Sequence, residues 1–281
     1  MDRQTDISGA TGNKLLRDVA VVIAAALVVV VAIFTTRTPA AYASHAGCGG
    51  SPPVATGAMP RGAAAVAIDG SISTNGRELR QSYRGAALAA VQVAAAHEWA
   101  ARIVVFGASG VGARVIFSGS FMPVSTVYAF NVAARNRLLC LAKKALASAF
   151  VSRIHLAGTD VAGAIAEQLA WGRSVVRSHG RVSLLALTDG CEAPARSGAN
   201  AHLTDLCPEL RKGRSPGWIL KHNRREFSLG HERGVHITME GVGVGRDQSA
   251  ASTLQAEKLV AFWGLACRRS RAVCKIASAV S

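Results

Sequence analysis

Short runs of consecutive apolar residues alternate along this chain with longer segments in which apolar residues recur every three or four positions. A continuous apolar run bounded by turn residues is typical of a strand buried on both faces of a sheet, whereas the longer spacing is typical of a helix with one buried face. The predicted strands cover residues 63–69, 103–106, 113–117, 182–187 and 235–244. The predicted helices cover residues 77–101, 127–150, 161–176 and 249–267.

The order of these elements predicts the fold class. Strands that alternate with helices form βαβ units, and the strands of such units are parallel. The runs 103–106 and 113–117 are joined only by the Gly-rich residues 107–112, so we expect a hairpin that places one antiparallel strand at the sheet edge. The prediction is an α/β fold with a Rossmann-like, mostly parallel central sheet flanked by helices.

The first 61 residues differ in composition from the rest and suggest three segments before the domain. Residues 1–18 are polar, 19–34 are apolar without a charge, and 35–61 are a linker rich in Pro, Gly, Ala and Ser. The apolar block has the length of a signal peptide's core and is slightly short for a membrane-spanning helix, so a cleaved signal and an uncleaved transmembrane anchor both stay open. Either one makes 62–281 an extracytoplasmic domain, tethered to the cell membrane by a single span or secreted.

Six cysteines in an exported chain predict disulfide bonds. Proximity in the sequence favours Cys191 with Cys207 and Cys267 with Cys274, which leaves Cys48 and Cys140, although six cysteines permit many other connectivities. The spacing does not match a zinc site, because no Cys-x-x-Cys pair occurs.

The charge balance is strongly basic, with 32 Lys and Arg against 17 Asp and Glu, a net charge of +15. Such an excess either solvates the surface or attracts an anionic partner such as a cell-wall polymer. Nucleic acid is not the expected partner, because no basic run is interleaved with stacking aromatic residues. Many of the cations lie in a long insertion at 191–234, which could be a solvated loop or could select anionic ligands: Arg211, Lys212, Arg214, Lys221, Arg224, Arg225 and Arg233.

Oxygen-bearing side chains follow several of the predicted strands. Asp69, Ser71 and Ser73 alternate directly after the first strand, Thr159 follows a glycine before a helix, and Asp189 follows a later strand within Thr-Asp-Gly. Because ligands of open α/β sheets bind beyond the carboxyl ends of parallel strands, we expect these five residues at one edge. Carboxylate and hydroxyl oxygens suit a hard cation such as Mg²⁺ better than zinc.

This arrangement resembles the von Willebrand factor A (vWA) domain, and the resemblance spans about residues 61–267. In that family a D-x-S-x-S strand end, a loop threonine and a T-D-G aspartate build a metal-ion-dependent adhesion site. The resemblance implies that Ser71 and Ser73 bind Mg²⁺, or another divalent cation such as Mn²⁺ or Ca²⁺, through their hydroxyls. It implies that Thr159 binds directly or through water, and that Asp69 and Asp189 act mostly through water and by hydrogen bonding the serines.

The family's ligand mode implies a function as well. An acidic side chain of a partner protein would complete the coordination shell of the cation. The expected function is therefore that of an exported or membrane-tethered domain, not an enzyme, which binds a protein or surface ligand through the metal. Two alternatives stay open, a metal-dependent hydrolase with Glu192 as its candidate general base, and a binder of anionic cell-wall polymer or nucleic acid through the basic insertion.

Overall fold

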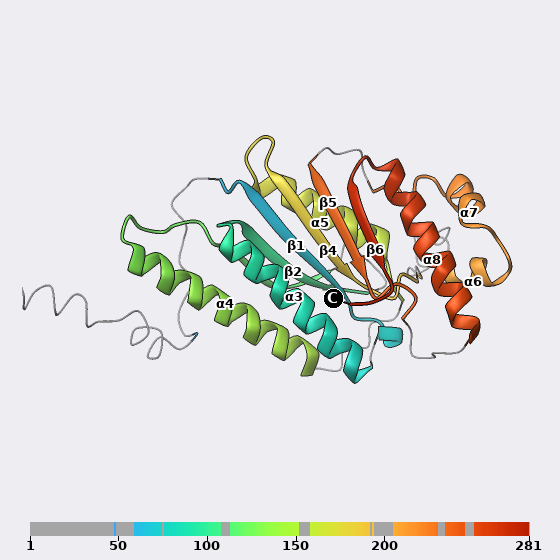
Figure 1. Ribbon diagram of the computed structural model, residues 1–281, viewed down its shortest axis with the longest axis horizontal. Coiled ribbons are helices and arrows are strands. Elements are labelled where there is room, and N and C mark those ends of the chain that lie inside the picture. The colour runs from blue at the N-terminus through green and yellow to red at the C-terminus, as the bar shows by residue number, and fades with distance from the viewer. Residues whose placement is uncertain are drawn as a thin grey trace, which may run out of the picture. The chain divides into compact units, whose positions relative to one another are not determined.

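Six strands form one sheet in the order β3-β2-β1-β4-β5-β6 in the computed structural model (Figure 1). The strands are β1 (Gly62–Asp69), β2 (Ala100–Phe106), β3 (Arg114–Ser120), β4 (Arg181–Leu187), β5 (Val235–Glu240) and β6 (Val273–Ala277). All neighbouring pairs are parallel except β2 and β3. This confirms the predicted α/β class, with its one antiparallel strand at the edge.

The structure describes residues 48, 59–74, 76–107, 113–151, 158–191, 193, 205–229, 234–244 and 250–280. The predicted segments 1–18 and 19–34 lie outside these residues, as does nearly all of the predicted linker 35–61. The membrane anchor and the signal peptide therefore stay predictions. Among the helices that the structure describes, none is both long and apolar enough to cross a membrane.

β1 lies at the centre of the sheet, and all eight of its residues are buried. Its alternate side chains enter two different cores, because successive residues of a strand point to opposite faces. Ala63, Ala65 and Ala67 pack in one core, and Ala64 and Val66 pack in the other. The continuous apolar run in the sequence follows from burial on both faces.

Helices cover both faces of the sheet (Figure 1). On one face lie α3 (Arg77–Ala96) and α4 (Tyr128–Val151). On the other lie α5 (Val161–Val175) and α8 (Ala250–Arg269), together with the short helices α6 (Leu206–Arg211) and α7 (Pro216–His222). The predicted helices 127–150, 161–176 and 249–267 thus agree with the structure to within about two residues.

Four predicted boundaries are wrong by three residues or more. The strand predicted over 103–106 begins at Ala100, and the strand predicted over 113–117 ends at Ser120. The helix expected over 77–101 ends at Ala96, because Glu98 adopts a left-handed conformation with φ of 57° and β2 begins at Ala100. The strand expected over 235–244 ends at Glu240, because Gly241 and Gly243 have φ of 84° and 83° and turn the chain.

The strand β6 was missed by the sequence analysis, which treated β5 as the last strand. β6 is short, and Val273 and Lys275 are exposed, so its residues form neither a buried run nor a clear alternation of apolar and polar positions. β6 pairs with β5 from His236 to Glu240. Its strand conformation therefore follows from this pairing and not from a local pattern in the sequence.

The insertion 191–234 is not simply a solvated loop in the part that the structure describes. Its helices bury Leu206, Leu210, Ile219 and Leu220 in the core beside α8. Phe227 completes this contact, packing edge-on against the aromatic rings of Phe262 and Trp263.

Three disulfides join Cys48 to Cys140, Cys191 to Cys207 and Cys267 to Cys274. The second and third pairs are those that proximity in the sequence favoured, and the first joins the two cysteines that were left, 92 residues apart. The bridge from Cys191 to Cys207 ties the first residues of the insertion to α6. The bridge from Cys267 to Cys274 joins the end of α8 to β6.

Candidate metal centre

The strand order reverses direction between β1 and β4. From β1 the chain proceeds to β2 and β3 on one side, and it then returns to β4 on the other side of β1. Ligands of open α/β sheets bind in the crevice at such a switch point, outside the carboxyl ends of the strands. Asp69 ends β1, and Asp189 lies two residues beyond the end of β4, so both carboxylates lie at this crevice.

The residues after β1 form a tight turn that faces the crevice. The Ser71 amide donates to Asp69 Oδ1 over 2.8 Å, and the Thr74 hydroxyl lies 3.0 Å from the carbonyl oxygens of both Asp69 and Ser71. This turn places the Ser71 and Ser73 hydroxyl oxygens 2.9 Å apart. Two hydroxyls and one carboxylate therefore lie side by side, as the D-x-S-x-S spacing predicts.

Asp189 is held from three directions. The Cys191 amide donates to Asp189 Oδ1 over 2.9 Å, and the Gly243 amide donates to its carbonyl oxygen over 2.8 Å. The Ser73 side chain interacts with the Asp189 carboxylate and lowers its pKa. Ser73 thereby joins the turn after β1 to the turn after β4.

Thr188 is a site residue that the sequence analysis missed. Its hydroxyl donates to Asp69 Oδ2 over 2.8 Å and accepts from the Gly190 amide over 3.0 Å. It is fully buried between the two strand ends. Its place directly before Asp189 in the Thr-Asp-Gly turn was a signal that could have identified it.

Thr159 reaches the same edge through its backbone. It pairs with Ala193 as an antiparallel bridge, and the next amide, that of Asp160, donates to the carbonyl oxygen of Gly107, just beyond β2. Asp160 caps α5 by accepting from the Gly163 amide over 2.7 Å. In the described part of the chain no hydrogen bond joins the buried Thr159 side chain to the other four predicted ligands.

The structure thus brings Asp69, Ser71, Ser73 and Asp189 together, whereas the described contacts of Thr159 are those of its backbone with Ala193. Glu192, the candidate general base of the hydrolase alternative, lies outside the described residues. The described chain contains no group of three or more His, Cys, Asp or Glu side chains placed to hold a metal. The donors at this crevice are of another kind, two carboxylates combined with hydroxyls.

Burial raises the pKa of both carboxylates, and the charge of Asp189 adds to the shift at Asp69. Burial raises the pKa of Asp69 to about 7, the negative charge of Asp189 raises it as well, and hydrogen bonds from Ser71 and Thr188 lower it. Burial also raises the pKa of Asp189, against the effect of hydrogen bonds from Ser73 and Cys191. Two adjacent buried carboxylates are costly without a compensating positive charge, so this donor set fits a divalent cation.

A buried tyrosine lies close enough to the two carboxylates to be affected by their charge. Tyr83 of α3 is fully buried, and its hydroxyl has no hydrogen-bond partner among the residues that the structure describes. It lies so close to Gly241 that a β-carbon there would come within 2.5 Å of the hydroxyl oxygen. Burial and the charges of Asp69 and Asp189 raise the pKa of Tyr83 well above its usual range, so the phenol stays neutral.

No family model matches the sequence, and no curated protein matches it. Among solved structures, the pilus adhesin SpaC from Lactobacillus rhamnosus GG in its open conformation is similar at 14% identity, with a TM-score of 0.44, over 80% of this chain and 29% of that one. Proximal thread matrix protein 1 from the mussel byssus is similar at 13% identity, with a TM-score of 0.34, over 74% of this chain and 49% of that one. This chain spans less than half the length of either protein.

Proposed function

We propose that this domain is a vWA-like binding module that captures a protein or surface ligand through a divalent cation, with Mg²⁺ as the expected ion. Asp69, Ser71, Ser73, Thr159 and Asp189 would hold the cation. The observation that carries the proposal is the cluster of Asp69, Ser71, Ser73 and Asp189 at the switch point of the sheet, in which hydrogen bonds link the first three and Ser73 lowers the pKa of Asp189. These residues come from two chain segments more than a hundred residues apart.

The hydroxyls and the carboxylates of the crevice would have different roles in binding a cation. The two serine hydroxyls are neutral oxygen ligands, and the carboxylates supply negative charge close by. Asp69 is fixed by the Ser71 amide and the Thr188 hydroxyl, and Asp189 by the Cys191 amide. A cation with such neutral ligands stays electrophilic and, when bound, offers a coordination position to the carboxylate of a partner.

We propose binding rather than catalysis. The hydrogen bonds that Asp69 and Asp189 accept hold both carboxylates in place, which suits a fixed ligand shell around a cation. The three disulfides support a domain that works outside the reducing cytoplasm, because disulfides persist in oxidising compartments. Attachment to the membrane through residues 19–34 is part of the same proposal.

The test measures capture of an immobilised peptide that presents one Glu side chain, using the full chain in a non-ionic detergent. A matched peptide with Gln in place of Glu is the ligand control. We expect capture of the Glu peptide to require Mg²⁺ and to be abolished by a chelator. Asp69→Ala and Ser71→Ala should abolish it without unfolding the domain, whereas Ser174→Ala, on an exposed part of α5, should not change it. Capture that survives both site substitutions, or chelation, contradicts the proposal.

A further inference from the structure

A pocket of about 430 Å³ lies between the end of α7 and the carboxyl-terminal end of α8. Three exposed cationic side chains line it, Lys221, Arg224 and Arg269. Its apolar part consists of three buried residues, Phe227, Leu229 and Ala266. A volume of this size is within the range of small-ligand sites.

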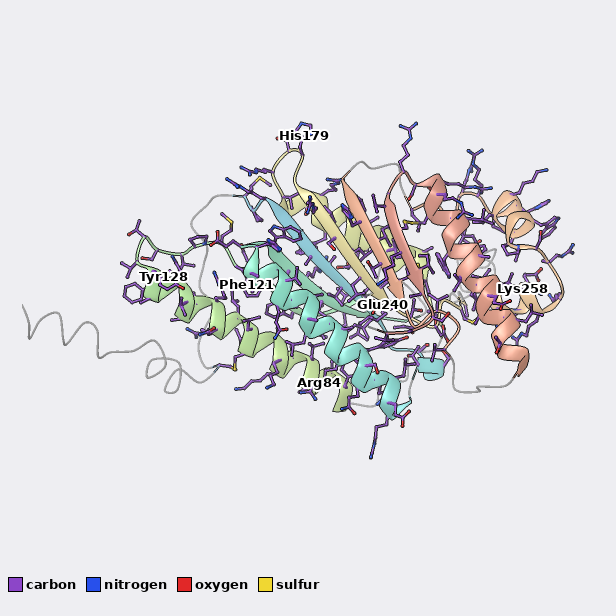
Figure 2. The ribbon with its side chains drawn as sticks, in the orientation of Figure 1. Arg84, Phe121, Tyr128, His179, Glu240 and Lys258 are labelled. Carbon is purple, nitrogen blue, oxygen red and sulfur yellow. A yellow bond between two sulfur atoms is a disulfide. The ribbon has the colours of Figure 1, made fainter. Side chains whose placement is uncertain are left out.

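The pocket lies at the opposite end of the sheet from the candidate metal centre. Arg269 ends α8 four residues before β6 begins, so the pocket is near the amino ends of the parallel strands, whereas Asp69 and Asp189 are at the carboxyl ends. Figure 2 marks the two ends, with His179 before the start of β4 and Glu240 at the end of β5. A strand of seven residues spans about 23 Å, so the two sites are separate.

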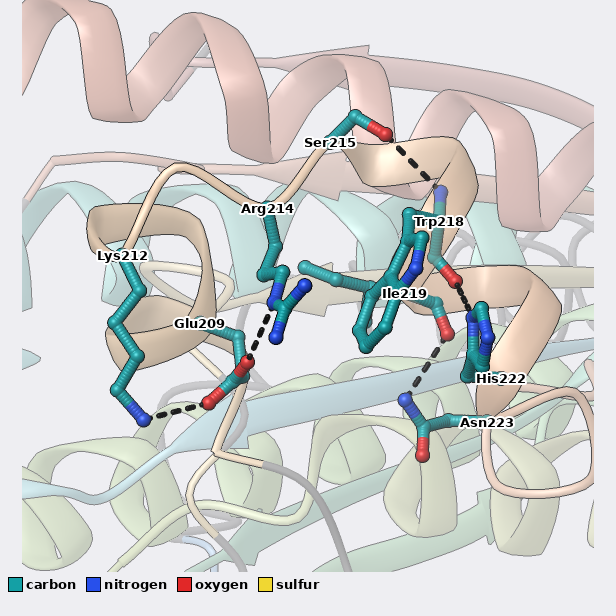
Figure 3. A network of polar contacts seen from close by, with 8 residues as sticks. All are labelled: Glu209, Lys212, Arg214, Ser215, Trp218, Ile219, His222 and Asn223. Carbon is teal, nitrogen blue, oxygen red and sulfur yellow. Dashed lines mark hydrogen bonds and ion pairs between the residues drawn. The ribbon is translucent and has the colours of Figure 1, made fainter.

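The basic residues of the insertion differ in whether an acid compensates them. Near α6, Glu209 pairs with Lys212 over 2.8 Å and with Arg214 over 3.8 Å, and the Arg214 guanidinium also stacks on Trp218 (Figure 3). Lys212 and Arg214 are thus both paired with an acid, and Arg214 also contacts an aromatic ring.

The cations of the pocket have no acid among the residues that line it with them. Glu226 is the acid of the same stretch, and it is half-buried with a partner of its own. Three more exposed cations are neighbours in the sequence of residues that line the pocket: Arg225, Arg268 and Arg271. The positive charge at this end of the domain is therefore uncompensated by the lining residues and concentrated around a concave surface.

Arg269 is oriented before any ligand arrives. Its Nη1 donates to the Leu220 carbonyl oxygen over 3.1 Å, at the end of α7, which fixes the guanidinium between the two helices. The remaining guanidinium donors suit the paired oxygens of a phosphate group, and Lys221 and Arg224 add charge at the same opening. The apolar residues could contact the organic part of such a ligand.

We propose that Lys221, Arg224 and Arg269 form a binding site for a phosphate-bearing group, either a free phosphate compound or a lipid headgroup. The site combines two residues of the insertion with one residue of α8. It does not depend on the metal centre, so a chelator should leave it unchanged. Chelator sensitivity therefore distinguishes a failure here from a failure of the proposed adhesion function.

The test measures amide hydrogen exchange of the full chain in two settings. In non-ionic detergent, the probe is inorganic phosphate. In nanodiscs, phosphatidylglycerol is compared with phosphatidylcholine. We expect slower exchange in residues 216–229 and 264–272 on binding. Protection by inorganic phosphate assigns a free phosphate compound, and protection only in phosphatidylglycerol assigns a headgroup.

Two double variants with the same loss of charge complete the test. Lys221→Gln/Arg224→Gln changes exposed side chains and should weaken binding on the order of tenfold or more. Lys212→Gln/Arg214→Gln removes two cations of the same insertion from outside the pocket and should leave the protection intact. The proposal is overturned if neither setting gives protection, or if the two double variants weaken binding equally.

Discussion

The hydroxyl of Thr188 donates a hydrogen bond to Asp69 Oδ2 over 2.8 Å and so joins the carboxyl ends of β4 and β1, 119 residues apart in the sequence. The same hydroxyl accepts from the Gly190 amide, which helps to set the turn that carries Asp189. One buried side chain thus orients both carboxylates of the candidate metal centre. This makes Thr188 a sensitive position for testing how the crevice is organised.

Thr188→Val keeps the shape of the side chain and removes both hydrogen bonds. It leaves Asp69 Oδ2 and the Gly190 amide short of a partner in a buried place, so we expect a loss of about 1–3 kcal/mol in the free energy of unfolding. Mg²⁺ affinity at pH 7 should also fall, because a hydrogen bond that favours the charged form of Asp69 is lost. Urea unfolding and calorimetric titration measure the two effects. Thr238→Val, in the middle of β5 and away from the crevice, is the control. An unchanged Mg²⁺ affinity in Thr188→Val would mean that Thr188 only supports the fold.

The stability of the metal-free domain should depend on pH through Asp69. Its pKa is about 7 in the folded domain against an ordinary value of 3.8, so between these values the folded state holds a proton that the unfolded chain has released. Stability from this group is therefore present at low pH and falls as the pH rises from about 4 to about 7, by up to about 1.4 kcal/mol per pH unit.

Comparison of the wild type with Asp69→Asn isolates this contribution from those of other carboxyl groups. Urea unfolding is measured from pH 4.5 to 7.5 with a chelator present. The wild type should lose stability relative to Asp69→Asn as the pH rises, and saturating Mg²⁺ should remove the loss by compensating the carboxylate charge. A difference between the two proteins that is constant over this pH range contradicts the assignment.

Tyr83→Phe removes a buried hydroxyl for which the described part of the chain offers no hydrogen-bond partner. An unsatisfied buried polar group costs about 1–3 kcal/mol, so the variant should be as stable as the wild type or more stable by about 1 kcal/mol. Tyr128→Phe is the matched control, because Tyr128 is exposed at the start of α4 (Figure 2) and its substitution should have little effect. If Tyr83→Phe is clearly less stable in urea unfolding, the hydroxyl has a partner such as a buried water.

Removal of either of two disulfides should lower stability, but only one of the two removals should also weaken metal binding. Replacement of Cys191 and Cys207 by Ser opens a loop with a sequence separation of 16 and should cost about 3 kcal/mol. It should also weaken Mg²⁺ binding, because the Cys191 amide holds the Asp189 carboxylate. Replacement of Cys267 and Cys274 should lower stability but leave Mg²⁺ affinity unchanged. This bridge lies at the carboxyl-terminal end of α8, away from the candidate metal centre. Equal effects on metal affinity would show that the first bridge acts only through stability.

Local patterns in the sequence determined much of the fold. The continuous run of β1, the helical spacing of α4 and α5, and the glycine-rich connection between β2 and β3 each follow from which faces of an element are buried. The spacing of Asp69, Ser71 and Ser73 likewise determined the turn that brings the two serine hydroxyls together. Burial periodicity and turn chemistry act over a few residues, and a sequence displays them directly.

Only the tertiary structure decided which distant segments meet. The strand order places Thr188 against Asp69, Tyr83 near both carboxylates, and Arg269 beside Lys221, and none of these contacts has a signature in local spacing. β6 joins the sheet through its pairing with β5, although its own pattern is weak. Such contacts depend on strand pairing and on helix packing across the whole domain, so the neighbours of each residue are fixed only when the sheet has assembled.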